Sequence, residues 1–255
     1  KTRRGFGEVC LKEAKMLTLN MPQDADKWIA FQWRSKEDFD ENHAEPISPE
    51  TLSNPHNTDI SVTFDISYSI LIRHESSDPS APDVTHLTSN GKPIISGTSW
   101  SGALRHAVHR LLHDMGKGDK SDTILTNLFG DVNEMTKTAK ASRVRVKESP
   151  IMGGQSLTYT RNKIDRFTGG VVDSALFDEQ PHYGGSVKLE ISIKDAKDWE
   201  KGLLLLALKD IGNGIQPIGG EANVGRGILT NPNIQTTIDE PECLKALAKK
   251  LQEVS

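Results

Sequence analysis

The chain has 255 residues, 35% of them hydrophobic, and its 31 Lys and Arg against 35 Asp and Glu give a net charge of −4. This balance excludes a polycation that coats nucleic acid, so any RNA binding must come from a local basic patch. No apolar run approaches the ~20 residues that a membrane-spanning helix requires, and Cys10 and Cys243 are too few for a disulfide framework or a cysteine zinc site.

The start of the chain repeats a segment found near its end. Residues 1–9 and residues 219–227 are two versions of one glycine-containing sequence. The aligned positions are Gly5 with Gly225, Gly7 with Gly227, and Val9 with Leu229. A repeat at this spacing indicates a duplicated module whose first copy is cut off at the start, in a piece of a longer polypeptide. We interpret residues 1–20 as the end of a preceding module, and the acidic, proline-containing residues 21–57 as a linker.

A strand is predicted over residues 60–72, where polarity alternates with a period of two. Its apolar positions are Ile60, Val62, Phe64, Ile66, Tyr68, Ile70 and Ile72, and Ser61, Thr63, Asp65, Ser67 and Ser69 form the other face. A loop rich in Ser, Asp and Pro follows over residues 75–83.

The next predicted element is an amphipathic helix that Ser99 or Ser101 can cap and that Gly116 ends. Its apolar stripe is Trp100, Leu104, Val108, Leu111 and Met115. The opposite face carries Arg105, His106, His109, Arg110 and His113. Three histidines at helical spacing suggest a metal site, but no carboxylate or Cys partner lies at that spacing among them. The pattern therefore favours a solvated or RNA-facing surface.

The second half of the chain predicts further strands and two helices. Residues 137–147 carry five basic residues and no acid, and Arg143, Arg145 and Lys147 alternate along one strand face. A clear strand runs over residues 187–193, and a buried helix over 197–211 follows Asp195 as a possible cap. A strand from Ile228 and a C-terminal amphipathic helix over 241–255 complete the chain. The order strand, helix, strands, helix, strand is typical of a ferredoxin-like α+β fold, which hosts many functions.

Residues 219–227 hold four glycines in nine positions. Glycine permits positive φ and a close backbone approach to a ligand, and such a loop can present amides to phosphate oxygens. Taken alone, the segment is better explained as a glycine-rich turn without a ligand.

Three stretches together carry a resemblance to a known family. They are residues 93–99 with Gly102 and Arg105, residues 161–170 with residues 177–179, and residues 219–227. In this order and spacing they resemble the RAMP superfamily, specifically the backbone subunits of type III CRISPR effector complexes, over about residues 58–235. The repeated segment at residues 1–9 resembles the tandem fusion of the type III-D and III-E effectors. The family usually has Pro where Ser96 stands.

The resemblance implies a ferredoxin-like RAMP module over residues 58–240 with a β-rich thumb insertion at about 137–178. It implies an RNA-guided antiviral complex in the prokaryotic cytoplasm, with no membrane association. The implied partners are guide crRNA, a single-stranded target RNA, neighbouring RAMP modules and other effector subunits. Modules of this kind bind guide phosphates without reading sequence, and the thumb kinks the guide–target duplex.

RNA contact is then expected at the helix start, the basic strand, the thumb and the glycine segment. The residues are Ser96, Gly97, Thr98, Ser99, Ser101, Arg105, His109, Arg143, Arg145, Lys147, Arg161, Lys163, Arg166, Gly219, Gly220, Asn223, Gly225, Arg226 and Gly227. Backbone amides with Arg and Lys side chains suit sequence-independent phosphate contacts.

The resemblance also implies an acid that cleaves target RNA in the loop after the first strand. Asp83 is the candidate because it lies ten residues before Pro93. Asp78 and Glu75 are alternatives in the same loop, and a turn-forming role for Asp83 after Pro82 is a serious rival. Asp83 could hold Mg²⁺ or Mn²⁺ or accept a proton during attack by the RNA 2′-hydroxyl.

Two other functions stay open. The module could be a structural guide-binding segment without catalysis, as some modules of fused effectors are. It could also be a guide-processing endonuclease that uses His106, His109 or His113 as a general acid or base. Periodic target cuts, no cuts, or one cut within repeat RNA would distinguish the three functions.

Overall fold

The computed structural model describes residues 14–32, 44–46, 57–75, 78, 80–133, 135 and 137–253. The chain divides into two compact units, one of residues 7–55 and a larger one that contains residues 56–255. The first glycine segment, at residues 1–9, lies outside the described residues. No helix among those described is long and apolar enough to cross a membrane.

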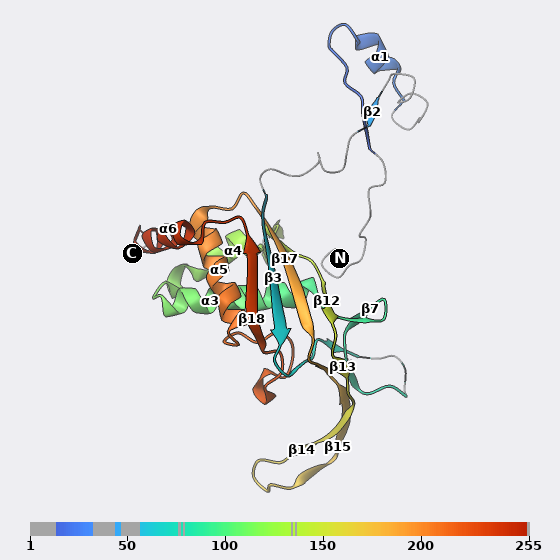
Figure 1. Ribbon diagram of the computed structural model, residues 1–255, viewed down its shortest axis with the longest axis vertical. Helices are drawn as coiled ribbons and strands as arrows, with labels where there is room; N and C mark the ends of the chain where they lie inside the picture. Colours follow the sequence, from blue (N-terminus) through green and yellow to red (C-terminus); the bar gives the residue numbers. More distant parts are fainter. Residues whose placement is uncertain are drawn as a thin grey trace. The chain divides into compact units, whose positions relative to one another are not determined.

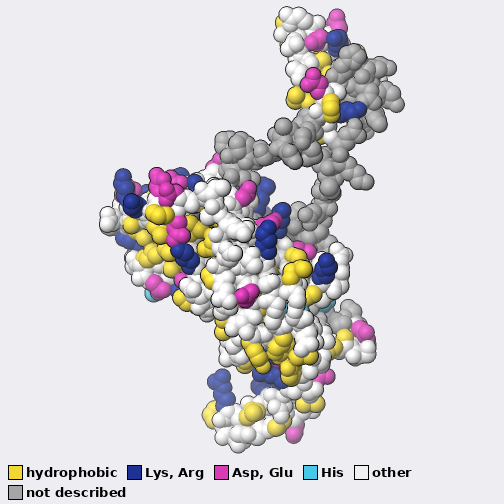
Figure 2. All heavy atoms as spheres, in the orientation of Figure 1, with side chains coloured by type: hydrophobic (Ala, Val, Ile, Leu, Met, Phe, Trp, Pro, Cys, Tyr) yellow, Lys and Arg dark blue, Asp and Glu magenta, His cyan; other side chains and the backbone are white. Residues whose placement is uncertain are grey.

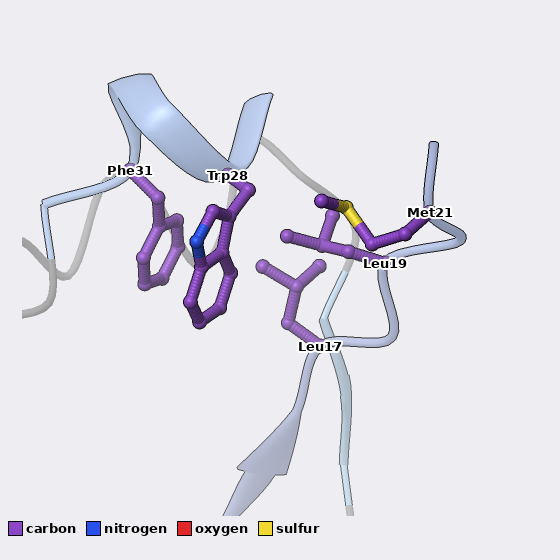
Figure 3. A pocket seen from close by; sticks show the side chains of 5 residues that line it. All are labelled: Leu17, Leu19, Met21, Trp28 and Phe31. Atoms are coloured by element: carbon purple, nitrogen blue, oxygen red, sulfur yellow. The ribbon is translucent and has the colours of Figure 1, made fainter. Parts of the chain in front are cut away.

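The small unit joins a short strand pair to a short helix. Strand β1 (Lys15–Met16) pairs antiparallel with β2 (Glu45–Pro46), and α1 (Ala25–Ala30) lies between them in sequence. Apolar side chains from α1 and from the segment after β1 line a hollow of about 250 Å³ (Figure 3). The lining residues are Leu17, Leu19, Met21, Trp28 and Phe31.

The larger unit is built on an antiparallel sheet whose central strands are β3 (Asn57–Ile66) and β17 (Ser186–Lys194). Strand β18 (Leu229–Thr236) pairs with the free side of β3, and β11 (Val144–Val146) pairs with β17. The strand predicted over 187–193 is confirmed, because its apolar residues Val187, Leu189, Ile191 and Ile193 are all buried. The sheet continues from β17 through β12 (Ser149–Met152) and β8 (Lys92–Ile95) to β7 (Thr88–Ser89).

Helices cover one face of this sheet (Figure 1). They are α3 (Gly97–Asp114), α4 (Gly118–Phe129), α5 (Asp198–Gly212) and α6 (Glu240–Glu253). The mixture of helices and sheet confirms the predicted α+β class. At the centre of the core Trp100 of α3 stacks on Phe64 of β3, with ring centroids 5.8 Å apart. Its indole Nε1 donates to the Ser149 hydroxyl at 3.1 Å, so this buried ring leaves no polar atom unpaired.

Two expected helix caps are wrong. Ser96, not Ser99 or Ser101, caps α3, and its hydroxyl accepts from the Ser99 amide at 3.2 Å. Helix α5 begins after Lys197 rather than at Asp195, and its first turn is closed by Glu200, whose carboxylate accepts from the Lys197 amide at 2.9 Å. In both cases a residue three positions away supplies the missing partner of an N-terminal amide.

The strand predicted over residues 60–72 ends earlier in the structure than the alternation of apolar residues indicated. Strand β3 ends at Ile66, and the chain bends at residues 67–68 before the short strand β4 (Ser69–Ile70). The bend breaks the alternation, so Tyr68 is 65% exposed, whereas Ser69 is fully buried. The expectation that Tyr68 belongs to the apolar face was therefore wrong.

A long β-hairpin projects from the larger unit (Figure 1). It consists of β14 (Tyr159–Ile164) and β15 (Val171–Gln180), which pair antiparallel. At its base β15 pairs in parallel with β6 (Val84–His86), which in turn pairs with β5 (Arg73–His74). Strands β11 and β12 lie within the central sheet. Only part of the thumb insertion expected over residues 137–178 therefore projects from the larger unit.

The remaining strands are short. Strand β9 (Asp131–Asn133) pairs with β10 (Thr138–Lys140). Strand β13 (Gln155–Ser156) pairs with β16 (His182–Tyr183), which also pairs with β4. Strand β16 therefore connects the base of the hairpin to the segment that follows β3.

Buried histidines fasten this region together. The His86 ring is 4% exposed, its Nε2 donates to the carbonyl of Ile94 at 3.0 Å, and its Nδ1 accepts from the Ile72 amide at 3.2 Å. Burial and the neighbouring His182 ring, 5.9 Å away, lower the pKa of His86 to about 4. The ring is therefore neutral in the folded chain over most of the pH range.

We predict that the chain loses stability as the pH falls from about 6.5 towards 4. In this window the unfolded chain binds a proton at His86 that the folded chain does not bind. Between pH 7 and pH 5 the expected loss of unfolding free energy from His86 is about 2 kcal/mol. Urea unfolding at both pH values measures it. His86→Gln should reduce the difference between the two values, whereas His109→Gln, at an exposed position of α3, should leave it as in the wild type. An unchanged pH dependence in His86→Gln would contradict this assignment.

Candidate nucleic-acid interface

The start of α3 offers fewer hydroxyls to a ligand than the sequence suggests. The Ser96 hydroxyl is buried and bonds to the Thr98 and Ser99 hydroxyls, each at 2.9 Å. Gly97 and Ser101 are also buried. Thr98 is exposed and Ser99 is half-buried, so these two remain accessible. Phosphate contacts expected at Ser96, Gly97 and Ser101 are not supported, because these residues face the interior.

The basic side chains of α3 are divided between structural contacts and the surface. Arg105 donates to the carbonyl of Gly130 at 3.1 Å, which ties α3 to the end of α4. His106 bonds to the Gln216 side chain at 2.7 Å, while His109 and His113 are exposed. No group of three or more His, Cys, Asp or Glu suited to a metal ion occurs in the part of the chain that the structure describes.

Arg143 is a structural residue. Its guanidinium donates to both carboxylate oxygens of Glu200 at 2.8 Å and to the carbonyl of Lys194 at 3.1 Å. Glu200 is buried on the first turn of α5, and its hydrogen bond and charge raise the pKa of Arg143. The structure does not support the free phosphate contact expected at Arg143, because this residue joins β11 to α5.

Arg145 and Lys147 differ from Arg143 because both are exposed. Arg145 lies on β11 opposite Ser192, and Lys147 follows the strand. Among the described residues, Lys147 Nζ forms a solvent-exposed ion pair with Glu190, at 3.4 Å. Exposed pairs of this kind contribute little and exchange easily, so both side chains are available to an anionic ligand.

Arg226, expected to contact RNA, is buried and only 7% exposed. Its Nη2 pairs with the carboxylate of Glu179 on β15, and its Nε donates to Glu221 Oε2 at 2.9 Å. Its Nη1 contacts the Ser69 hydroxyl at 3.3 Å and the Tyr183 hydroxyl at 3.4 Å. All three guanidinium nitrogens have partners within the protein, so the structure does not support the expected RNA contact of Arg226.

Glu179 is the buried centre of the same network. Its Oε1 also accepts from Arg161 Nη1 at 2.9 Å, while Oε2 is buried without a hydrogen-bond partner among the described residues. Burial alone would raise the pKa of Glu179, but Arg161 and Arg226 lower it overall. The carboxylate is therefore charged, and it holds the hairpin to the glycine segment.

The glycine segment uses many of its amides internally. The amide of Gly220 donates to the carbonyl of Leu71 at 2.8 Å, and that of Gly227 donates to the carbonyl of Ser69 at 2.7 Å. The amides of Gly225 and Arg226 donate to carbonyls within the segment itself. These groups brace the segment against β4, so the expected amide cradle is largely occupied by the protein. Gly219 and Asn223 are exposed at its surface.

The hairpin carries the most exposed mixture of basic and apolar side chains. Lys163 and Arg166 are exposed, and Phe167 at the tip is 98% exposed. Asp165 shapes the turn, since its Oδ1 accepts from the amides of Phe167 and Thr168 at 2.8 Å. Figure 2 shows basic and hydrophobic side chains along this projecting part. Apolar side chains exposed on a hairpin indicate a binding surface.

An aromatic cluster at the base of the hairpin was not anticipated. Tyr183 contacts Tyr68 edge-on, with centroids 5.3 Å apart, and lies 5.6 Å from Tyr159. Tyr68 and Tyr159 are both exposed. These tyrosines come from three segments distant in sequence, so no local pattern identifies them. The contacts of Glu221 with arginines were not anticipated either. An acidic residue within a segment expected to bind phosphate is unusual, and this feature of the sequence could have pointed to them.

Asp83 is exposed beside the hairpin, and its Oδ2 accepts from the Asp178 amide at 2.9 Å. Asp78 is also exposed, and the Ser80 amide and hydroxyl lower the pKa of its carboxyl. A carboxylate is the donor type that Mg²⁺ prefers, but Asp83 offers a single carboxylate already bonded on one oxygen. RNA phosphates and water would have to complete the coordination shell of a cation there.

We predict different effects of the same substitution at two glycines of the segment. Both Gly225 and Gly227 have positive φ, at 86° and 76°. A Cβ at Gly225 meets no atom within 4 Å, whereas one at Gly227 overlaps the carbonyl oxygen of Ile218. Gly225→Ala should cost about 1 kcal/mol of unfolding free energy, from backbone strain alone. Gly227→Ala should cost clearly more, and equal losses in urea unfolding would contradict this packing.

Comparison with known proteins assigns the chain to a family. No curated protein matches it. The model of the RAMP superfamily matches residues 63–230, which is more than half of the chain and runs from β3 into β18. The chain therefore belongs to the RAMP superfamily, whose members are associated with CRISPR-related RNA binding.

Proposed function

We propose that this chain is part of the backbone of a type III CRISPR effector complex and binds guide RNA through its phosphates, without reading sequence. The observation that carries the proposal is the RAMP match, which covers the whole segment from β3 to β18 that holds the candidate interface. Guide crRNA, target single-stranded RNA, neighbouring modules and other effector subunits are its proposed partners, in the prokaryotic cytoplasm.

The strand order supports a ferredoxin-like module. In sequence the principal strands are β3, β11, β17 and β18, with α3 after the first and α5 after the third. In the sheet they lie in the order β18, β3, β17, β11. This is a strand–helix–strand–strand–helix–strand unit with its last strand beside its first. We further propose that residues 1–20 end a preceding module and that residues 21–57 are the linker of a tandem fusion.

The RNA surface that we propose excludes the arginines held inside the protein. It consists of residues that are at least partly exposed on α3, on and just after β11, on the hairpin and on the glycine segment. They are Thr98, Ser99, His109, Arg145, Lys147, Lys163, Arg166, Gly219 and Asn223. The hairpin is the proposed thumb, and its exposed Phe167 and Ile164 suit contact with unstacked bases.

We predict that Lys163→Ala with Arg166→Ala weakens RNA binding and flattens its salt dependence. Each phosphate contact to a single strand contributes about 0.7 to the slope of log affinity against log salt, so the double variant should lose about 1.4. Fluorescence anisotropy with a labelled single-stranded RNA across a salt series measures the slope. Lys245→Ala with Lys249→Ala removes the same charge from exposed positions of α6 and should leave the slope unchanged. A hairpin variant with the wild-type slope would place the RNA elsewhere.

A second proposal, target cleavage at Asp83, is favoured by one contact. The hydrogen bond from the Asp178 amide fixes this exposed carboxylate beside the base of the hairpin. An RNA kinked there can bring a 2′-hydroxyl in line with the adjacent phosphate, so positioning supplies much of the rate. The 2′-oxygen bonds to phosphorus, the bond from phosphorus to the 5′-oxygen breaks, Asp83 accepts the 2′ proton, and the 5′-oxygen takes a proton from water. If Asp83 instead held a divalent cation, the cation would lower the charge of the phosphate and water would accept the 2′ proton.

We predict that Asp83→Asn abolishes the cut opposite this module in the assembled complex. Asn keeps an oxygen that can accept from the Asp178 amide but lacks the negative charge, so the rate should fall by about 100-fold or more. The assay maps fragments of labelled target RNA in the presence of Mg²⁺, and binding of guide and target should persist. Asp78→Asn is the matched control and should leave the ladder unchanged. Loss of the cut only in Asp78→Asn would assign the acid to Asp78, and absence of any cut in the wild type would favour a structural module.

A further inference from the structure

Glu221 occupies the centre of a group of arginines. Its Oε2 accepts from Arg226 Nε at 2.9 Å and from Arg161 Nη1 at 3.2 Å. Its Oε1 lies 3.8 Å from Arg73 Nη2. The three guanidinium groups come from β5, β14 and the glycine segment, so they converge on one carboxylate from separate parts of the sequence. A guanidinium recognises phosphate and carboxylate oxygens with the same paired geometry.

The contacts of Glu221 hold it in an unfavourable backbone conformation. Its φ is 63° and its ψ is 34°, which lies in the left-handed region of backbone conformation that residues other than Gly, Asn and Asp seldom adopt. Such a conformation persists where surrounding contacts over-determine it, and it occurs often in ligand clamps and switch regions. Gly219 and Gly220 precede Glu221, and Gly225 and Gly227 follow it, so the flanking backbone can rearrange if the carboxylate leaves.

The two carboxylates of the network are not equivalent. Glu179 and Glu221 both accept from Arg161 Nη1, so they repel each other across one nitrogen. Glu179 is fully buried and pairs with buried Arg226. Glu221 faces the outer arginines, since the side chain of Arg73 is 61% exposed and that of Arg161 is 36% exposed. A competing anion can therefore reach the contacts of Glu221 with Arg73 and Arg161, but not the buried pair of Glu179 with Arg226.

We propose that Arg73 and Arg161 form a phosphate site that Glu221 fills in the free protein and that an RNA phosphate takes over on binding. The inference rests on the proposed function as a guide-RNA-binding module. Without the Glu221 carboxylate the network carries three arginines against one glutamate, which leaves an excess of positive charge for a phosphodiester. Glu221 thus keeps the arginines positioned while RNA is absent.

The tyrosines beside this site indicate a nucleotide rather than a free anion. The Tyr183 hydroxyl contacts Arg226 Nη1 at 3.4 Å, and Tyr183 packs against the exposed rings of Tyr68 and Tyr159. Aromatic faces next to a basic group are the combination that binds single-stranded nucleic acid, because bases stack on the rings irrespective of sequence. The site therefore suits a phosphate together with its adjoining base.

Glu221→Gln tests the inference in the whole chain by fluorescence anisotropy with single-stranded RNA. Removal of the competing carboxylate should tighten binding by roughly fivefold and steepen the salt slope by about 0.7. Glu240→Gln is the matched control, because it removes an equal charge from the start of α6, where Glu240 pairs with Lys209 of α5. Glu221→Gln combined with Arg73→Ala should lose the gain. Weaker binding in Glu221→Gln, or a gain equal to that of Glu240→Gln, overturns the proposal.

A second variant and a second probe separate the possible failures. Glu221→Asn also removes the carboxylate and suits the left-handed conformation, so it tests the site if Glu221→Gln folds poorly. Thermal unfolding with inorganic phosphate should show a larger stabilisation of either variant than of the wild type, dependent on Arg73. If neither wild type nor variants bind RNA while phosphate stabilises the variants, the phosphate site stands and the guide-binding function fails. If the wild type binds RNA and the variants show no gain with either probe, the function stands and this inference fails.

Discussion

The buried ion pair between Arg226 and Glu179 is the contact on which the arrangement of the interface depends. It joins the glycine segment to β15, and Arg226 also reaches Ser69 beyond the end of β3. Burying two charges costs several kcal/mol per ion, and their attraction offsets this cost only when the remaining polar atoms are hydrogen-bonded. The guanidinium meets this condition at every nitrogen, whereas Oε2 of Glu179 has no hydrogen-bond partner among the described residues. Removal of either partner would leave an uncompensated buried charge where the hairpin meets the sheet.

A second pair repeats this principle between β11 and α5. Arg143 binds buried Glu200 through two nitrogens, which closes the first turn of α5 against β11. The arginines singled out in the sequence therefore differ in role. Some hold the fold together, and others are exposed and are proposed to bind RNA. Burial distinguishes them, because the guanidinium of Arg226 is enclosed by its partners inside the protein, whereas those of Arg73 and Arg161 keep exposed edges.

Local periodicity in the sequence was enough to predict the main elements of the fold. The alternation in β17 and in β3 up to Ile66 predicted strands, and the stripes of α3 and α5 predicted helices, because each pattern reports burial of one face. The order of these elements agreed with the α+β class. The starts of the helices were predicted less accurately. Ser96 lies before the apolar stripe of α3, and Glu200 is an acid within the first turn of α5, so hydrophobic periodicity marks neither residue as the one that completes the helix start.

The candidate site could be predicted only in part. The exposed Lys163 and Arg166 follow from a polar hairpin sequence, but the partners of Arg226 do not. Glu179 and Ser69 lie 47 and 157 residues from it in the chain, so no local pattern relates them. Tyr68 was misplaced because the bend after Ile66 shifts the alternation. Contacts of this kind depend on tertiary packing, which residue spacing does not encode.

The hydrogen bond between Asp83 and the Asp178 amide has a geometric consequence. This bond joins β15 to Asp83, and β15 also pairs in parallel with β6, which begins immediately after Asp83. Asp83 is therefore held at the base of the hairpin. In an array of such modules along an RNA, the distance from each inserted hairpin to its neighbouring carboxylate would be constant. The spacing between protein subunits, not the nucleotide sequence, would then set the interval between cleaved bonds.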